Sequence, residues 1–267
     1  MLHLQKILAP VDLSPASVVS VQFAGALARR FEAFVTLVHC SGSEETREKL
    51  QALGCRELGS QPFSTLVLPG DPAREIVEYA HSAHFGLIVM ATHGYGPFRR
   101  LVLGSVTTQV LDRSDCPVFT GAHLEQAAAG HGTRFDTVVC SVDLGPKTEE
   151  VAGWAGEFAK AVGARLFLLH VIPDLPAAEG DYYSAGANLV PVEQATESLH
   201  ALCDSLRLSA RVIVAGGPLP DSVCRQASEL GADVLVAGRG TSAGRLGRLR
   251  SNAFGIIRGA PCPVITV

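Results

Sequence analysis

Short apolar runs alternate with amphipathic stretches along the chain, a pattern typical of strands and helices in an α/β protein. In the first half, the runs predict strands at Lys6–Ala9, Val35–His39, Phe63–Leu68, Leu87–Ala91 and Val118–Thr120. Because these runs are continuous rather than alternating, we expect strands that are covered on both faces, as in a parallel sheet. The pattern therefore predicts a five-stranded, doubly wound parallel sheet with helices on both faces.

Two of the predicted helices begin with the same local signal, a capping residue followed by proline at the first helical position. This signal occurs at Ser14–Pro15 and again at Asp71–Pro72. In the first of these helices, Val19, Phe23 and Leu27 recur every four residues and are expected to face the sheet. A last helix is predicted at Ser105–Arg113, just before the fifth strand.

The second half of the chain repeats the first. Ile7–Cys40 aligns without a gap with Val138–Val171, at an offset of 131 residues (138 − 7). Further on, LPGDPAREIVEYA matches AGGPLPDSVCRQA, and CPVFT matches CPVIT in the same order. We therefore predict two tandem domains of the same fold, 1–122 and 134–267, joined by the small-residue linker Gly121–Thr133.

The net charge and the cysteine content limit which partners and which cellular location are expected. The net charge of −4 provides no overall basic field for nucleic acid or for an acidic membrane surface. No stretch approaches the ~20 apolar residues of a membrane span. The seven cysteines include no C-x-x-C pair, so a disulfide framework or a zinc site is not expected, and a cytoplasmic location is the simplest expectation.

The most informative motif follows the fourth strand. Ala91-Thr92-His93-Gly94 is followed, after nine residues, by Gly104 and Ser105 at the start of a helix. Glycine allows the backbone to approach a ligand closely, and the free N–H groups of a helix N-terminus bind anions. This is a phosphate cradle, but neither a Walker loop nor a dinucleotide-binding fingerprint.

With Asp12 after the first strand, the Thr92-His93-Gly94 turn and the Gly104-Ser105 pair, the sequence resembles a universal stress protein domain. The resemblance covers both halves and implies a parallel sheet of order 3-2-1-4-5. One subgroup of that family binds ATP through a motif of the form G-x-x-G, nine residues, G-[ST]. This chain departs from the motif at its first glycine, which is Ala91, and has Pro97 inside the loop.

Carried over residue by residue, the resemblance implies an ATP site in the first domain. It assigns the nucleoside end to Val11, Asp12 and Cys40, and the ribose and phosphates to Ala91, His93, Gly94, Gly104, Ser105 and Val106. In an open α/β sheet, Asp12 and Gly94 would lie at the switch point where ligands bind. Asp12 could instead cap the following turn. The sequence leaves open whether Mg²⁺ accompanies the phosphates.

The second domain keeps only part of this motif. Asp143, Gly238, Gly240 and Ser251 remain, but Arg250 replaces the phosphate-side glycine. The arginine either fills the space for the phosphates or reaches them as a charge partner, and we expect a degenerate, empty site. The roles of the Arg-rich segment 239–258 and of the insertion 173–191 stay open, although a long loop is often functional or mobile.

The resemblance implies a stress-response regulatory protein that binds ATP or another adenine nucleotide and hydrolyses it very slowly or not at all. We assign no catalytic residue and no metal ligand. An ATP-hydrolysing enzyme on the same fold and a nucleotide-free interaction module are the alternatives. Family domains often pair through their last strands, so Val118–Thr120 and Val264–Thr266 are expected to form an intramolecular pseudo-dimer, and a homodimer is open.

Overall fold

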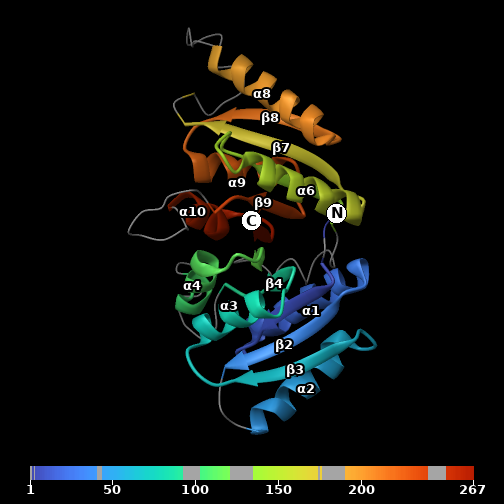
Figure 1. The fold of residues 1–267 in the computed structure, drawn as a ribbon. Coiled ribbons are helices and arrows are strands. Elements are labelled where there is room, and N and C mark those ends of the chain that lie inside the picture. Colours follow the sequence, from blue (N-terminus) through green and yellow to red (C-terminus); the bar gives the residue numbers. More distant parts are fainter. Residues whose placement is uncertain are drawn as a thin grey trace. The chain divides into compact units, whose positions relative to one another are not determined.

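The computed structural model describes residues 2, 4–40, 44–92, 103–120, 135–173, 175, 190–239 and 251–267. Two compact units follow one another along the chain, divided between residues 134 and 135. They are called unit 1 and unit 2 below, and each is a parallel sheet with flanking helices (Figure 1). No helix in these ranges combines the length and the apolar character that crossing a bilayer requires.

Unit 1 alternates strands and helices as the apolar runs predict. Its elements are β1 (Lys6–Pro10), α1 (Pro15–Phe31), β2 (Phe34–Cys40), α2 (Glu44–Leu58), β3 (Phe63–Leu68), α3 (Pro72–Ser82), β4 (Leu87–Val89), α4 (Ser105–Arg113) and β5 (Val118–Thr120). The strand order is β3-β2-β1-β4-β5, as expected. On β1, Ile7 is in register with Val35 of β2 on one side and with Leu87 of β4 on the other.

Unit 2 has the same topology. Its elements are β6 (Thr137–Ser141), α6 (Thr148–Val162), β7 (Arg165–Ile172), α8 (Val190–Leu206), β8 (Ala210–Gly216), α9 (Leu219–Glu229), β9 (Val234–Ala237), α10 (Ser251–Gly259) and β10 (Val264–Thr266). The order β8-β7-β6-β9-β10 mirrors that of unit 1. Val138 of β6, the counterpart of Ile7, pairs with Leu166 and Val234.

The helices pack in pairs within each unit. In unit 1, α1 contacts α2 and α3 contacts α4, while in unit 2 α6 contacts α8 and α9 contacts α10. The centre of each sheet is apolar and fully buried, as at Leu8, Ile88 and Phe119 in unit 1 and at Val139 and Leu235 in unit 2. Burial on both faces explains why the strand sequences are continuous apolar runs.

The repeat extends to the backbone conformation of the turns. Both units place a leucine in the left-handed region three residues after the end of the first strand, Leu13 with φ 63° and Leu144 with φ 56°. Such a conformation is uncommon for a non-glycine residue. The other left-handed residues among those described also form pairs at equivalent places: Glu32 and Gly163, Gly59 and Arg207, Gly70 and Gly217, His84 and Gly231. The two units are thus alike in turn geometry as well as in topology.

Two details differ from the sequence-based predictions. The strand β4 ends at Val89, and Met90 and Ala91 follow it outside the strand, although the N–H of Met90 still donates to the carbonyl of Phe119 in β5 at 3.0 Å. The helix α2 is not named by the apolar pattern, because its charged residues dominate the segment. Leu50 and Leu53 are nevertheless buried three residues apart on its inner face.

The core of unit 2 can be tested through the chain's single tryptophan, Trp154. Its ring stacks on Phe158 with centroids 5.3 Å apart, and Phe158 is fully buried. We expect Phe158→Ala to lower the free energy of unfolding of unit 2 by about 3–5 kcal/mol, because it leaves a cavity. Urea unfolding followed by tryptophan fluorescence measures this change.

Val190→Ala is the matched control, because Val190 is 48% exposed. That substitution should change the free energy of unfolding by less than about 0.5 kcal/mol. A loss below roughly 1 kcal/mol for Phe158→Ala would show that the Trp154–Phe158 cluster is not part of the cooperative core.

Candidate functional site

A cavity of about 350 Å³ opens in unit 1 where the carboxyl ends of β1, β2 and β4 meet the start of α4. This is the switch point of the sheet, because the chain leaves β1 and β4 toward opposite neighbours. Seven of the nine predicted nucleotide-site residues line it: Val11, Asp12, Cys40, Ala91, Gly104, Ser105 and Val106. The remaining two, His93 and Gly94, lie outside the described residues, as do residues 95–102 of the loop.

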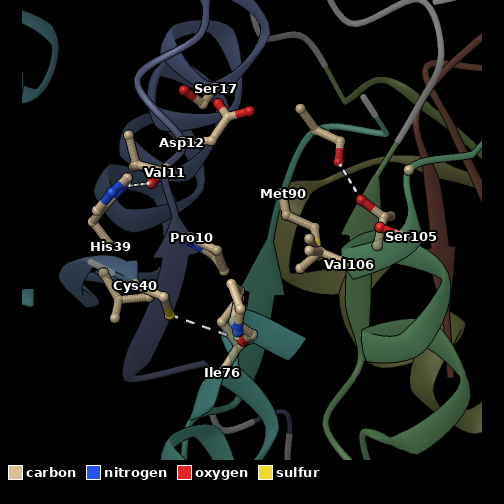
Figure 2. Close-up of a pocket in the computed structure, with 15 residues that line it drawn as sticks. Pro10, Val11, Asp12, Ser17, His39, Cys40, Ile76, Met90, Ser105 and Val106 are labelled. Atoms are coloured by element: carbon tan, nitrogen blue, oxygen red, sulfur yellow. Dashed lines mark hydrogen bonds between the residues drawn. The ribbon is translucent and has the colours of Figure 1, made fainter. Parts of the chain in front are cut away.

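Figure 2 shows the two walls of this cavity. Val11, Asp12, His39 and Cys40 form one wall, while Ser105 and Val106 face them across the opening. The volume falls within the range of ~300–1,000 Å³ that is usual for small-ligand sites. Residues far apart in the sequence therefore share one concave site of suitable size.

The backbone of Val11 is fixed by two hydrogen bonds to β2. Its N–H donates to the carbonyl of Val38 at 2.8 Å, and its carbonyl accepts from Nδ1 of His39 at 2.6 Å. Because a carbonyl can only accept, Nδ1 of His39 must carry the proton. Val11 therefore offers mainly an apolar side chain to the cavity, and His39 has a structural role. His39 lines the cavity but was not among the predicted site residues.

Asp12 performs the turn-capping role that the sequence left as an alternative. Its Oδ1 accepts a hydrogen bond from the N–H of Ser14 at 2.9 Å. Within the described residues, no hydrogen bond involves the other oxygen, Oδ2, and the side chain is exposed at the cavity. One carboxylate can thus hold the turn through one oxygen and offer the second to a ligand.

Cys40 lines the wall beside α3. It is half-buried, and its Sγ lies 3.9 Å from the carbonyl oxygen of Pro72. Burial raises the pKa of the thiol to about 11, and the carboxylates of Glu75 and Asp71 contribute to the shift. The thiol is therefore protonated near neutral pH and contributes bulk rather than nucleophilicity.

The opposite wall is built from the start of α4. Gly104 is the N-cap residue, and no side chain of the described residues caps the helix, whereas α1 and α3 are capped by Ser14 and Asp71. The first N–H groups of α4 and the exposed hydroxyl of Ser105 thus face the cavity without a capping side chain. Such a helix start favours a bound anion.

Two hydrogen bonds hold this wall against the end of β4. The N–H of Gly104 donates to the carbonyl of Thr92 at 2.8 Å, and Oγ1 of Thr107 donates to the carbonyl of Ala91 at 3.0 Å. The start of α4 is consequently fixed relative to β4 by residues on both sides of the loop. Thr107 was not predicted as a site residue. The sequence feature that could have identified it is a hydroxyl side chain in the first turn of the helix that follows the motif glycine.

Unit 2 has a smaller cavity at the equivalent place, about 200 Å³ in volume. Of the residues predicted for the degenerate site, Asp143 and Gly238 line this cavity, and Ser251 begins α10. Gly240 and Arg250 lie outside the described residues, so the predicted effect of Arg250 stays a prediction. Oδ1 of Asp143 accepts from the N–H of Gly145 at 2.9 Å and from Oγ1 of Thr148 at 3.3 Å.

Two cations that were not predicted as site residues line the cavity of unit 2. Lys147 and Arg239 contribute to its wall, and Arg239 is 6% exposed. At the aligned positions of unit 1 stand Ala16 and Thr92, which are small and uncharged. The two cavities therefore differ in electrostatics as well as in volume. The sequence feature that could have placed Arg239 at the cavity is its position directly after the motif glycine Gly238.

The first position of the motif is Ala91 in unit 1 and Gly238 in unit 2, and the packing around it differs between the units. A Cβ on Gly238 would lie 3.2 Å from Cγ2 of Val151 on α6, which is a tight contact. The aligned position on α1 is Ser20, which is smaller than valine. Unit 1 can therefore accept a methyl group at Ala91, where the motif has glycine.

The comparisons with known proteins agree with this architecture. The sequence matches the universal stress protein family over residues 41–120 and 134–267. Universal stress protein A homolog 1 of Coxiella burnetii is 32% identical over 139 residues, which are 50% of this chain and 96% of that protein. A universal stress protein of Methanocaldococcus jannaschii is 32% identical over 136 residues, 43% of this chain and 79% of that protein.

The fold is also found in a solved structure. The crystal structure of a universal stress protein from Archaeoglobus fulgidus covers 99% of this chain and 98% of its own, with a TM-score of 0.74 and 19% identity. At that identity the likeness concerns the fold. Together with the family match over both halves, it leads to one conclusion: the chain belongs to the universal stress protein family and contains two of its domains.

Proposed function

We propose that this protein is a stress-response regulatory protein that binds ATP or another adenine nucleotide in unit 1, with no hydrolysis or very slow hydrolysis. The observation that supports the proposal is the convergence of Val11, Asp12, Cys40 and the start of α4 on one cavity at the switch point. This cavity has an apolar side for a base and an uncapped helix start for phosphates.

The chemistry of the cavity favours binding over catalysis. Among the described lining residues, Asp12 has the only formal charge, and the thiol of Cys40 is protonated near neutral pH. His39 is engaged with the carbonyl of Val11 through Nδ1. None of these is a general base poised beside a nucleophile. Whether Mg²⁺ accompanies the phosphates stays open.

Unit 2 is proposed to bind no nucleotide. Its cavity is smaller, and Lys147 and Arg239 stand where unit 1 has small neutral side chains. Pairing of the two domains through Val118–Thr120 and Val264–Thr266, further homodimerisation and a cytoplasmic location also remain proposals from the family resemblance.

The first test introduces into unit 1 the residue that stands in unit 2. Gly104→Arg should weaken ATP binding by at least roughly 100-fold, about 3 kcal/mol, because a long side chain would fill the phosphate end. Gly104 has φ −59°, so the backbone accepts an arginine. Equilibrium dialysis with ATP, and chromatography of nucleotide released on denaturation, measure the loss.

Gly59→Arg is the matched control for that test. Gly59 has φ 60° and no atom near its missing Cβ, and its counterpart in unit 2, Arg207, has φ 53°. This variant adds the same charge away from the cavity and should bind ATP like the wild type. Undiminished binding by Gly104→Arg would mean that the site is misplaced, and rapid turnover of ATP-Mg by the wild type would favour the enzyme alternative.

The second test separates the two roles of Asp12. Asp12→Asn keeps an oxygen for the N–H of Ser14 but replaces the charged acceptor at Oδ2. We expect ATP binding to weaken by about 10- to 100-fold, the cost of one hydrogen bond to a charged group, with little change in melting temperature. Asp143→Asn should leave ATP binding unchanged. Equal weakening by both variants would contradict a site confined to unit 1.

The third test uses the thiol of Cys40 as a reporter. With a pKa of about 11, roughly one thiol in a thousand is a thiolate at pH 8, so iodoacetamide should modify Cys40 much more slowly than the exposed Cys55. The rate at Cys40 should rise about tenfold per pH unit up to pH 10. Mass spectrometry of the two peptides measures both rates.

Saturating ATP should slow alkylation of Cys40 further at pH 9 and leave the rate at Cys55 unchanged. If ATP binds by dialysis but does not protect Cys40, the nucleoside end of the site does not lie beside this residue.

A further inference from the structure

A second concave surface of unit 2 lies at the opposite end of the strands from Asp143 and Gly238. A groove of about 890 Å³ opens at the amino ends of β7 and β8, beside the last turns of α6 and α8. Four cationic side chains line this groove: Lys160, Arg165, Arg207 and Arg211. Among the lining residues that the structure describes, Glu157 is the one that is acidic. The groove is thus locally basic in a chain of net charge −4.

The described residues do not provide an ionic partner for these four side chains. None of the four forms an ion pair there, and the one hydrogen bond of the Arg165 guanidinium within the described residues is to Oγ1 of Thr137, at 2.8 Å. Lys160 and Arg207 stand at helix ends, where they offset the partial negative charge of the helix C-terminus. Arg165 and Arg211 lie at strand starts and have no such role.

The register of β7 and β8 places Arg165 and Arg211 on one face of the sheet. Arg211 pairs with Phe167, and Arg165 is two residues before Phe167 on the same strand. Side chains two residues apart point to the same face, as do registered neighbours on adjacent parallel strands. The two guanidinium groups are therefore directed to the same side of the groove.

Unit 1 lacks this cluster although its backbone is alike. At the positions equivalent to Arg165, Arg207 and Arg211 it has Phe34, Gly59 and Ser64, given by the 131-residue offset, the shared left-handed turn and the strand register. Unit 1 forms the same strands and the same left-handed turn without arginine at these positions. The three arginines are therefore not needed for the fold of unit 2.

The rest of the lining limits the kind of anion that fits. Ala159, Leu166, Leu206 and Leu208 provide an apolar part, and the described lining includes no aromatic side chain. Single-stranded nucleic acid binds by stacking on aromatic rings, which this lining lacks. An inorganic phosphate chain has no apolar group for the leucines. A peptide that combines carboxylates with aliphatic side chains matches both parts.

We propose that this groove binds a short acidic peptide segment of a partner protein. Its carboxylates pair with Arg165, Arg207 and Arg211, whose planar forks suit carboxylate oxygens. Its aliphatic side chains lie against Leu206 and Leu208. The volume is within the ~300–1,000 Å³ of typical ligand sites, so only a few residues of the segment are bound.

The test uses a fluorescein-labelled peptide, Asp-Leu-Glu-Glu-Leu-Asp, and fluorescence anisotropy with the full chain at low salt. Binding should weaken about tenfold or more in the double variant R165Q/R211Q. The control variant R30Q/K49Q removes two exposed cations from unit 1 and should change binding less than about twofold. Peptides with Leu→Ser or with all carboxylates replaced by amides should bind at least roughly fivefold more weakly.

Because Arg165 bonds to Thr137, a second variant, R207Q/R211Q, keeps that contact and should weaken binding to a similar degree. Circular dichroism melting of each variant confirms that it is folded. The proposal is overturned if the peptide fails to bind up to about 1 mM, or if R30Q/K49Q weakens binding as much as R165Q/R211Q. It is also overturned if polyphosphate or an oligonucleotide displaces the peptide at lower concentration than the unlabelled peptide does.

Discussion

The central position of β1 in a parallel sheet is the constraint on which the candidate site depends. Ile7 of β1 is paired with Val35 on one side and with Leu87 on the other, so the chain must leave β1 and β4 in opposite directions. The carboxyl ends of these strands then have no helix directly above them, and a crevice remains. Asp12 lies there because it follows β1 within two residues, and α4 lies there because its start is bonded to the end of β4.

The same constraint operates in unit 2, yet the chemistry at the crevice has changed. His170 donates through Nδ1 to the carbonyl of Val142 at 2.9 Å, as His39 does to Val11 at 2.6 Å. The turn after the first strand has the same left-handed leucine in both units. The backbone frame is therefore common to the two units, while Arg239 alters the wall of the cavity in unit 2 alone. Frame and site can differ independently because the bonds that hold the frame, between main-chain groups and from the rings of His39 and His170, do not involve the side chains that differ at the cavity.

Much of this was predictable from local sequence signals. The start of α4 at Ser105 followed from the Gly-Ser pair, and the buried strands followed from their continuous apolar runs. The end of β4 was placed two residues too late, because Met90 and Ala91 continue the apolar run beyond Val89, the last residue of the strand. Lys147 and Arg239 were not predicted to share a cavity, because they are 92 residues apart (239 − 147) and only the sheet topology joins them.

The basic groove at Arg165 and Arg211 could not be predicted from the sequence either, because only the sheet topology brings its residues together. The cavity at Asp143 lies at the carboxyl ends of the strands, whereas Arg165 and Arg211 lie at the amino ends. A strand of five to eight residues separates the two edges by more than a Debye length of ~8–10 Å, so solvent-exposed charges at one edge act weakly at the other. The loss of a nucleotide site at one edge would therefore leave recognition at the other edge intact. Because the whole chain is acidic, attraction of an acidic segment must come from the local cluster and not from the overall field.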